Sequence, residues 1–124
     1  MNAPVRVLLV EDNETFRQTL ELLFGLRDEI EVVASVATGE AAPPLVALHK
    51  PDVVLMDYRM PGLNGAEATR AVLEACPGTR VVCLTASVSA GEIDDLMAAG
   101  AVSCLTKDVD LNEIVDSVRR AAAA

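Results

Sequence analysis

The chain has 124 residues, a formal net charge of −9, and a composition that is 52% hydrophobic but only 2% aromatic. This length fits one globular domain, residues 1–124, whose core needs neither disulfides nor metal to fold. The acidic balance argues against direct contact with nucleic acid, which depends on clustered lysines and arginines. No apolar run is long enough to cross a bilayer and no signal-like segment opens the chain, so we expect a cytoplasmic protein.

The first part of the chain predicts a strand, a helix and a second strand. Val5 to Val10 is a β-rich run that stops at the acidic and turn-forming residues 11–13. A helix is predicted next, with Asn13 placed to cap its start and Gly25 near its end. Its apolar residues recur at helical spacing: Phe16, Leu20, Leu23 and Phe24. Ile30 to Val36 predicts the second strand.

The rest of the chain repeats this alternation. A helix around Ala42 to Leu48 contains Pro43-Pro44, which helix interiors reject but first turns accept, so we expect a short helix that begins late. Further strands are predicted at Val53 to Met56, Val81 to Leu84 and Val102 to Leu105. Further helices are predicted at Ala66 to Ala75, at Glu92 to Ala99, and from Leu111 onward.

The last helix has the clearest pattern. Its apolar residues follow i, i+3, i+4, i+7 spacing: Leu111, Ile114, Val115 and Val118. Asp110 and Glu113 resemble a capping box at its start. Five strands alternating with five helices predict an α/β fold with a doubly wound parallel sheet, because parallel neighbours need crossover helices that cover both faces.

Polar residues stand at the ends of the predicted strands, and ligands bind at that edge of an open parallel sheet. They are Glu11, Asp12, Asp57, Thr85 and Lys107. Three carboxylates brought together at neutral pH repel one another unless a cation neutralises them. Mg²⁺ is the expected cation, because it takes hard oxygen ligands and leaves room for phosphate oxygens.

Asp57 is the expected nucleophile, because it ends a fully apolar strand and an aspartate can accept a phosphoryl group beside a metal. Lys107 would supply a positive charge to the phosphoryl oxygens, and the Thr85 hydroxyl a hydrogen bond. Each residue alone could equally be a cap or a turn residue. Their agreement at successive strand ends favours a single site.

The sequence resembles the response-regulator receiver family over essentially its full length. The matching segments are VLLVEDNETFR, PDVVLMDYRMPGLNGAEATR, VVCLTAS and AAGAVSCLTKD. The resemblance implies strand order 2-1-3-4-5, with Mg²⁺ held by Glu11, Asp12, Asp57 and the backbone carbonyl of Arg59. It also implies Asp57 as phosphoacceptor, with Thr85 and Lys107 as its partners. Asp57 would take its phosphoryl group from a sensor histidine kinase.

The resemblance extends to the expected output. DYRMPGLNG followed by LTKD looks most like receivers that precede a LuxR-type helix-turn-helix. A DNA-binding domain that controls transcription is therefore expected outside these 124 residues. The family also implies possible phosphorylation-dependent homodimers. Only self-phosphorylation and autodephosphorylation chemistry is expected, so the chain is not expected to be an enzyme acting on external substrates.

Cys104 is the main departure from the family pattern, which usually has Tyr or Phe three residues before the lysine. We expect phosphorylation to order the loop after Thr85 with little change at Cys104. The ordinary role for this thiol is apolar filler, as for Cys76 and Cys83, because the three cysteines form no metal-binding pattern. Arg59 and Ser87 stand where the family tunes its dephosphorylation rate.

Three other functions share part of this pattern. Haloacid-dehalogenase enzymes also use an aspartate nucleophile with magnesium, but they carry a second aspartate where this chain has Arg59. Nucleotide binding is disfavoured, because the sequence contains neither a G-x-G-x-x-G motif nor a Walker-type glycine loop. A degenerate receiver that only binds other proteins is opposed by the presence of all five site residues, although Cys104 keeps this alternative open.

Overall fold

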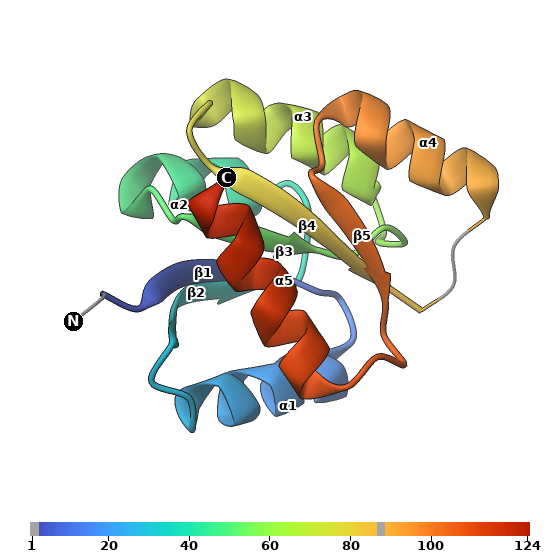
Figure 1. The fold of residues 1–124 in the computed structure, drawn as a ribbon. Helices are drawn as coiled ribbons and strands as arrows, with labels where there is room; N and C mark the ends of the chain where they lie inside the picture. Colours follow the sequence, from blue (N-terminus) through green and yellow to red (C-terminus); the bar gives the residue numbers. More distant parts are fainter. Residues whose placement is uncertain (1–2, 87–88) are drawn as a thin grey trace.

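The computed structural model describes residues 3–86 and 89–124. Five parallel strands form one sheet in the order β2-β1-β3-β4-β5, which confirms the predicted α/β fold (Figure 1). The strands are β1 (Val5–Val10), β2 (Ile30–Val36), β3 (Val53–Met56), β4 (Arg80–Thr85) and β5 (Ser103–Thr106). The helices are α1 (Glu14–Gly25), α2 (Ala42–His49), α3 (Gly65–Ala75), α4 (Ala90–Ala99) and α5 (Leu111–Ala123).

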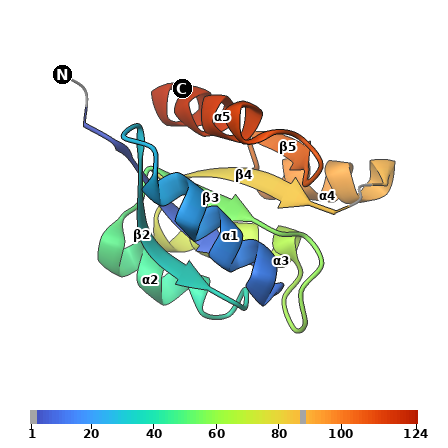
Figure 2. The same ribbon diagram turned by 90° about the horizontal axis from the view of Figure 1, so that it is seen from below.

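The sheet lies between two helical layers, with α1 and α5 on one face and α2, α3 and α4 on the other (Figure 2). Side chains on the first face pack around Phe24 and Val115, and those on the second around Val46, Val72 and Leu96. The central strand β3 is buried at all four positions. Coverage of both faces explains why its sequence is uniformly apolar rather than alternating.

Local signals set most helix boundaries. Asn13 accepts a hydrogen bond from the Phe16 N–H and caps α1, as predicted. Asp110 caps α5 in the same way through the Glu113 N–H. The reciprocal capping box occurs at α3, where Asn64 and Glu67 bond to each other's backbone N–H groups. Each cap places a helix immediately after a loop that leaves the sheet.

Some strand and helix boundaries in the structure differ by one or two residues from those predicted. The predicted last strand, Val102 to Leu105, lies one residue later at Ser103–Thr106. Helix α4 begins two residues earlier than expected, because Ser89 caps it through the Glu92 N–H. Helix α2 is short and carries its prolines in the first turn, as the sequence predicted. Across the described ranges 3–86 and 89–124, every helix is too short or too polar to traverse a bilayer.

Candidate functional site

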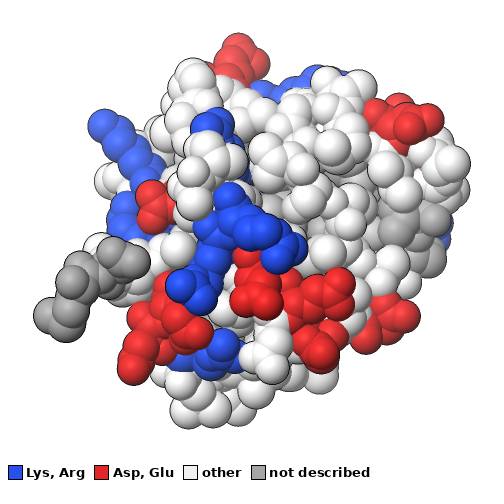
Figure 3. Space-filling view, in the orientation of Figure 1, with Lys and Arg blue, Asp and Glu red and all other residues white. Residues whose placement is uncertain are grey.

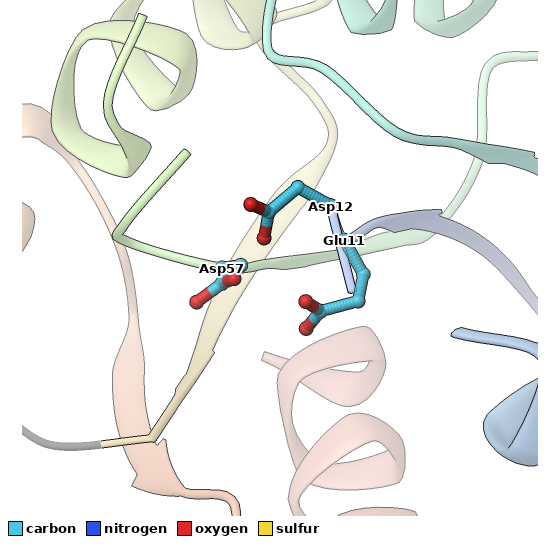
Figure 4. A group of neighbouring side chains, drawn as sticks. All are labelled: Glu11, Asp12 and Asp57. Atoms are coloured by element: carbon cyan, nitrogen blue, oxygen red, sulfur yellow. The ribbon is translucent and has the colours of Figure 1, made fainter. Parts of the chain in front are cut away.

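Three carboxylates meet beyond the ends of β1 and β3 (Figure 4). Glu11 and Asp12 follow β1 directly, and Asp57 follows β3 directly. The two strands are adjacent, and the Asp57 N–H donates to the Val10 carbonyl at 3.0 Å. One oxygen from each carboxylate lies within 4.8 Å of the others, with Glu11 and Asp57 buried and Asp12 exposed. The structure therefore brings together the three residues that the sequence grouped.

Lys107 is the cation nearest to this cluster among the described residues. Its Nζ lies 2.7 Å from Glu11 Oε1 and 3.4 Å from Asp57 Oδ2. It also lies 4.7 Å from the centre of the Phe16 ring, an attractive arrangement for a cation. The loop after β5 is held in place because the Lys107 N–H donates to the Thr85 carbonyl at 2.8 Å. One lysine thus pairs with two of the three acids, and the cluster keeps an excess of negative charge.

The excess of negative charge in this cluster affects the pKa of Asp57. Burial and the neighbouring Glu11 carboxylate raise the pKa of Asp57 to about 7, and Lys107 opposes this rise. A carboxyl group in this position is ionised only in part near neutral pH, yet a nucleophilic aspartate must be ionised. A divalent cation among these oxygens would favour the ionised form. The chemistry of the donor set therefore fits Mg²⁺, which prefers carboxylate oxygens and keeps several waters.

Glu11 is already well supported by protein groups. Its Oε2 accepts from the Asn13 N–H at 3.0 Å, while Oε1 pairs with Lys107. Arg17 donates to the Glu11 backbone carbonyl at 2.8 Å and ties this residue to helix α1. These contacts fix Glu11 beside Asp57 and beside Asp12, which is exposed on the rim.

The other site residues expected from the sequence lie at the same edge of the sheet. Thr85 is the last residue of β4 and is buried. Arg59 is two residues beyond Asp57, and its guanidinium pairs with Glu92 of α4 rather than with the acidic cluster. Ser87, expected to tune dephosphorylation, lies outside the described residues, as does part of the loop after Thr85.

The loop from Asp57 to α3 is tightly folded, and the Pro61-Gly62 and Asn64-Gly65 pairs are the local turn signals that could have indicated it. Its return is closed by the Gly65 N–H donating to the Tyr58 carbonyl at 2.7 Å. A Cβ at Gly65 would lie 2.7 Å from the Tyr58 Cα and still closer to the Asp57 carbonyl oxygen. Glu40, from the loop before α2, accepts from the Leu63 N–H at 2.6 Å. Glu40 is too distant in sequence for local pattern to reveal it.

Cys104, where the sequence departs from the pattern of the family that it resembles, pairs directly with Cys83 across β4 and β5. Both thiols are free and face the layer of α3 and α4. Burial raises the pKa of the Cys83 thiol and that of Cys104, which favours the protonated form of both. Their role as apolar filler therefore agrees with their surroundings.

The face that carries α5 mixes charges of both signs (Figure 3). Lysine and arginine side chains on this face lie beside aspartate and glutamate side chains, and Arg27 pairs with Glu29 at 2.9 Å. Positive and negative side chains therefore stand side by side on this face.

Comparison with known proteins gives consistent matches over nearly the whole chain. Residues 7–119 match the family model of the response regulator receiver domain. The chain is 36% identical to the response regulator GacA of Pseudomonas aeruginosa, over 96% of this chain and 56% of that protein. It is 31% identical to the transcriptional regulatory protein DegU of Brevibacillus brevis, over 93% of this chain and 49% of that protein. The chain thus spans about half the length of these relatives.

Solved structures agree with these matches. A signal receiver domain from Mycobacterium tuberculosis superposes with a TM-score of 0.93 at 34% identity, and the match covers 99% of each chain. A LuxR-family two-component response regulator from Aurantimonas sp. SI85-9A1 gives a TM-score of 0.90 at 30% identity, over 97% of this chain and 86% of that one.

Proposed function

Because the chain belongs to the response regulator receiver domain family, we propose that Asp57 is its phosphoacceptor and that Glu11, Asp12 and Asp57 hold Mg²⁺. The observation that supports this most directly is the meeting of three carboxylates within 4.8 Å of one another. Lys107 lies at the same place, within ion-pair distance of two of them. The backbone carbonyl of Arg59 is the proposed fourth protein ligand.

The proposed reaction is phosphoryl transfer to a carboxylate. An Asp57 oxygen attacks the phosphorus of the donor, the bond between phosphorus and its leaving nitrogen or oxygen breaks, and an acyl phosphate forms on Asp57. Bound Mg²⁺ would offset charge on the transferred group. The Lys107 ammonium would exchange part of its contact with Glu11 and Asp57 for a phosphoryl oxygen, and Thr85 would donate its hydroxyl hydrogen.

The donor and the output follow from the family. We propose a sensor histidine kinase as the phosphoryl donor and transcriptional control as the output, through a DNA-binding domain outside residues 1–124. The chain's own chemistry would be limited to gaining and losing this phosphoryl group. Homodimer formation on phosphorylation is a further part of the proposal. The related LuxR-family regulators support this choice of output.

Incubation with acetyl phosphate and Mg²⁺, followed by intact mass spectrometry, tests the acceptor. We expect one phosphoryl adduct on the wild-type chain and loss of the adduct when Mg²⁺ is chelated. Asp57→Asn should abolish the adduct, whereas Asp52→Asn, five residues earlier in the same segment, should leave it unchanged. An adduct that survives Asp57→Asn would remove Asp57 from this role.

A further inference from the structure

Two anions act on the Arg59 guanidinium: Glu92, with which it pairs, and the nearby Asp57, and both raise its pKa. It is two residues beyond Asp57, and its Nη2 donates to Glu92 Oε1 of α4 at 2.8 Å. The Arg59 side chain is 65% exposed, whereas that of Glu92 is only 16% exposed. The exposed arginine side chain therefore has room to adopt other conformations, whereas the Glu92 side chain is packed against the protein.

Glu92 lies in the first turn of α4 and is hydrogen-bonded to Ser89, the residue that caps this helix. Ser89 accepts from the Glu92 N–H at 3.2 Å, and its hydroxyl donates to Glu92 Oε1 at 3.3 Å. The other oxygen, Oε2, is buried and accepts no hydrogen bond from the described residues. Arg59 and Ser89 lower the pKa of Glu92, so the carboxylate is charged at neutral pH. Most of its compensation comes from Arg59.

Tyr58, next to Arg59, also connects the loop after Asp57 with helix α4. The Tyr58 hydroxyl has a raised pKa because of burial and of the nearby carboxylates Asp95 and Glu92. Tyr58 and Arg59 thus both face the first two turns of α4 from the loop that follows Asp57. The Gly65 N–H bonds to the Tyr58 carbonyl and closes this loop. Tyr58 and Arg59 therefore connect Asp57 directly to the start of α4.

We propose that Arg59 acts as a switch residue, which pairs with Glu92 in the unmodified chain and with the phosphoryl group once Asp57 is phosphorylated. Loss of Arg59 leaves Glu92 half-buried without a cation and loosens the first turn of α4. This inference rests on the proposed function, because it requires a phosphoryl group on Asp57. It supplies a path from the site to α4 that does not use position 104.

The relative strengths of the two pairings support this exchange. An ion pair with an exposed arginine is weak, because water competes for both partners. An acyl phosphate carries more negative charge than the carboxylate it replaces, and arginine binds phosphate oxygens with two parallel hydrogen bonds. Glu92 lies in the first turn of α4 and is bonded to the capping residue Ser89. Loss of its cation is therefore expected to weaken this first turn.

Amide hydrogen exchange measured by NMR tests the proposal. The reporters are the amides of Glu92 and Ile93, which bond to Ser89, and the reference is the Ile114 amide in α5. In the wild-type chain kept phosphorylated by excess acetyl phosphate and Mg²⁺, we expect both reporters to exchange about two- to fivefold faster, the size of effect expected for an exposed ion pair. The reference should not change. Intact mass gives the occupancy of Asp57.

Two variants isolate the ion pair. Glu92→Gln should give fast reporter exchange before phosphorylation and no further increase after it, and Arg59→Met should do the same at matched occupancy. Asp94→Asn and Arg70→Met are the controls, because they remove equal charges from exposed positions on α4 and α3. These controls should keep the wild-type response.

The outcomes separate this proposal from the one on which it rests. If no adduct forms on the wild-type chain, both proposals fail. An adduct at Asp57 with unchanged exchange at Glu92 and Ile93 overturns only the role of Arg59. So does a full wild-type response in Glu92→Gln, since the reporters would then respond without the charge pair.

Discussion

At the scale of single residues, the site depends on backbone geometry as much as on charged side chains. Gly65 allows the chain to return from β3 into α3 close behind Asp57, where its N–H bonds to the Tyr58 carbonyl. The sequence showed an Asn-Gly pair at this place, but it did not show what a larger residue would strike. The reason is that the contact involves backbone atoms brought near by the fold.

Gly65→Ala should therefore destabilise the chain although alanine is the better helix former. The added methyl group would press on the backbone of Asp57 and Tyr58, and we expect a loss of about 1–3 kcal/mol in the free energy of unfolding. Urea denaturation measures it. Gly78→Ala is the matched control, because a methyl group added there would have no neighbouring atom within 4 Å, and it should change stability by less than about 0.5 kcal/mol. Equal effects at both positions would contradict the close approach.

At the scale of elements, each functional loop is bounded by a capped helix. Helix α5 begins four residues after Lys107, and the Asp110 carboxylate accepts from the Glu113 N–H at 2.9 Å. The same helix buries Ile114, Val115 and Val118 against the sheet. The cap and the apolar face together determine where the loop carrying Lys107 ends.

Removal of this cap should weaken the end of α5 nearest the site. Asp110→Ala leaves an N–H without its side-chain partner, and we expect a loss of about 1 kcal/mol in the free energy of unfolding. Asp110→Asn keeps the accepting oxygen and should lie within a few tenths of a kcal/mol of the wild type. Thermal or urea unfolding compares the three chains. An alanine variant as stable as the asparagine variant would show that the cap contributes nothing.

At the scale of the whole molecule, the site draws its acids from separate loops that only the folded sheet brings together. Ligand binding to such a site stabilises the folded state, because the unfolded chain does not hold the ligands in place. Mg²⁺ should therefore raise the unfolding temperature, with a gain of about 2.7 kcal/mol when its concentration is a hundredfold above its dissociation constant. Differential scanning calorimetry with and without chelator measures this gain.

Asp12→Asn should reduce the Mg²⁺ response, because it removes one of the three clustered carboxylates. Asp28→Asn is its control. Asp28 is exposed and lies just before β2, at the amino ends of the strands, whereas the acidic cluster lies at their carboxyl ends. A response to Mg²⁺ that is equal in both variants would place the cation elsewhere.

Local pattern was enough to predict the elements and their type. The run Val53–Met56 is wholly apolar because β3 is covered on both faces, and the helical spacing in Leu111–Ala123 marks the face that α5 buries. Boundaries were less certain, as at β5 and α4, because hydrogen bonds such as that of Ser89 extend an element beyond its apolar core. The grouping of Glu11, Asp12 and Asp57 followed from the rule that parallel strands end at one edge.

The sequence by itself determined which residues build the sheet, which helices cover it, and which acids end its strands, because these properties are periodic or local. Only the tertiary structure decided that Lys107 Nζ lies closer to Glu11 than to Asp57, that Glu40 supports the loop after Asp57, and that Arg59 pairs with Glu92. Each of these contacts joins residues far apart in the chain. Their distances depend on how strands and helices pack, which no local pattern encodes.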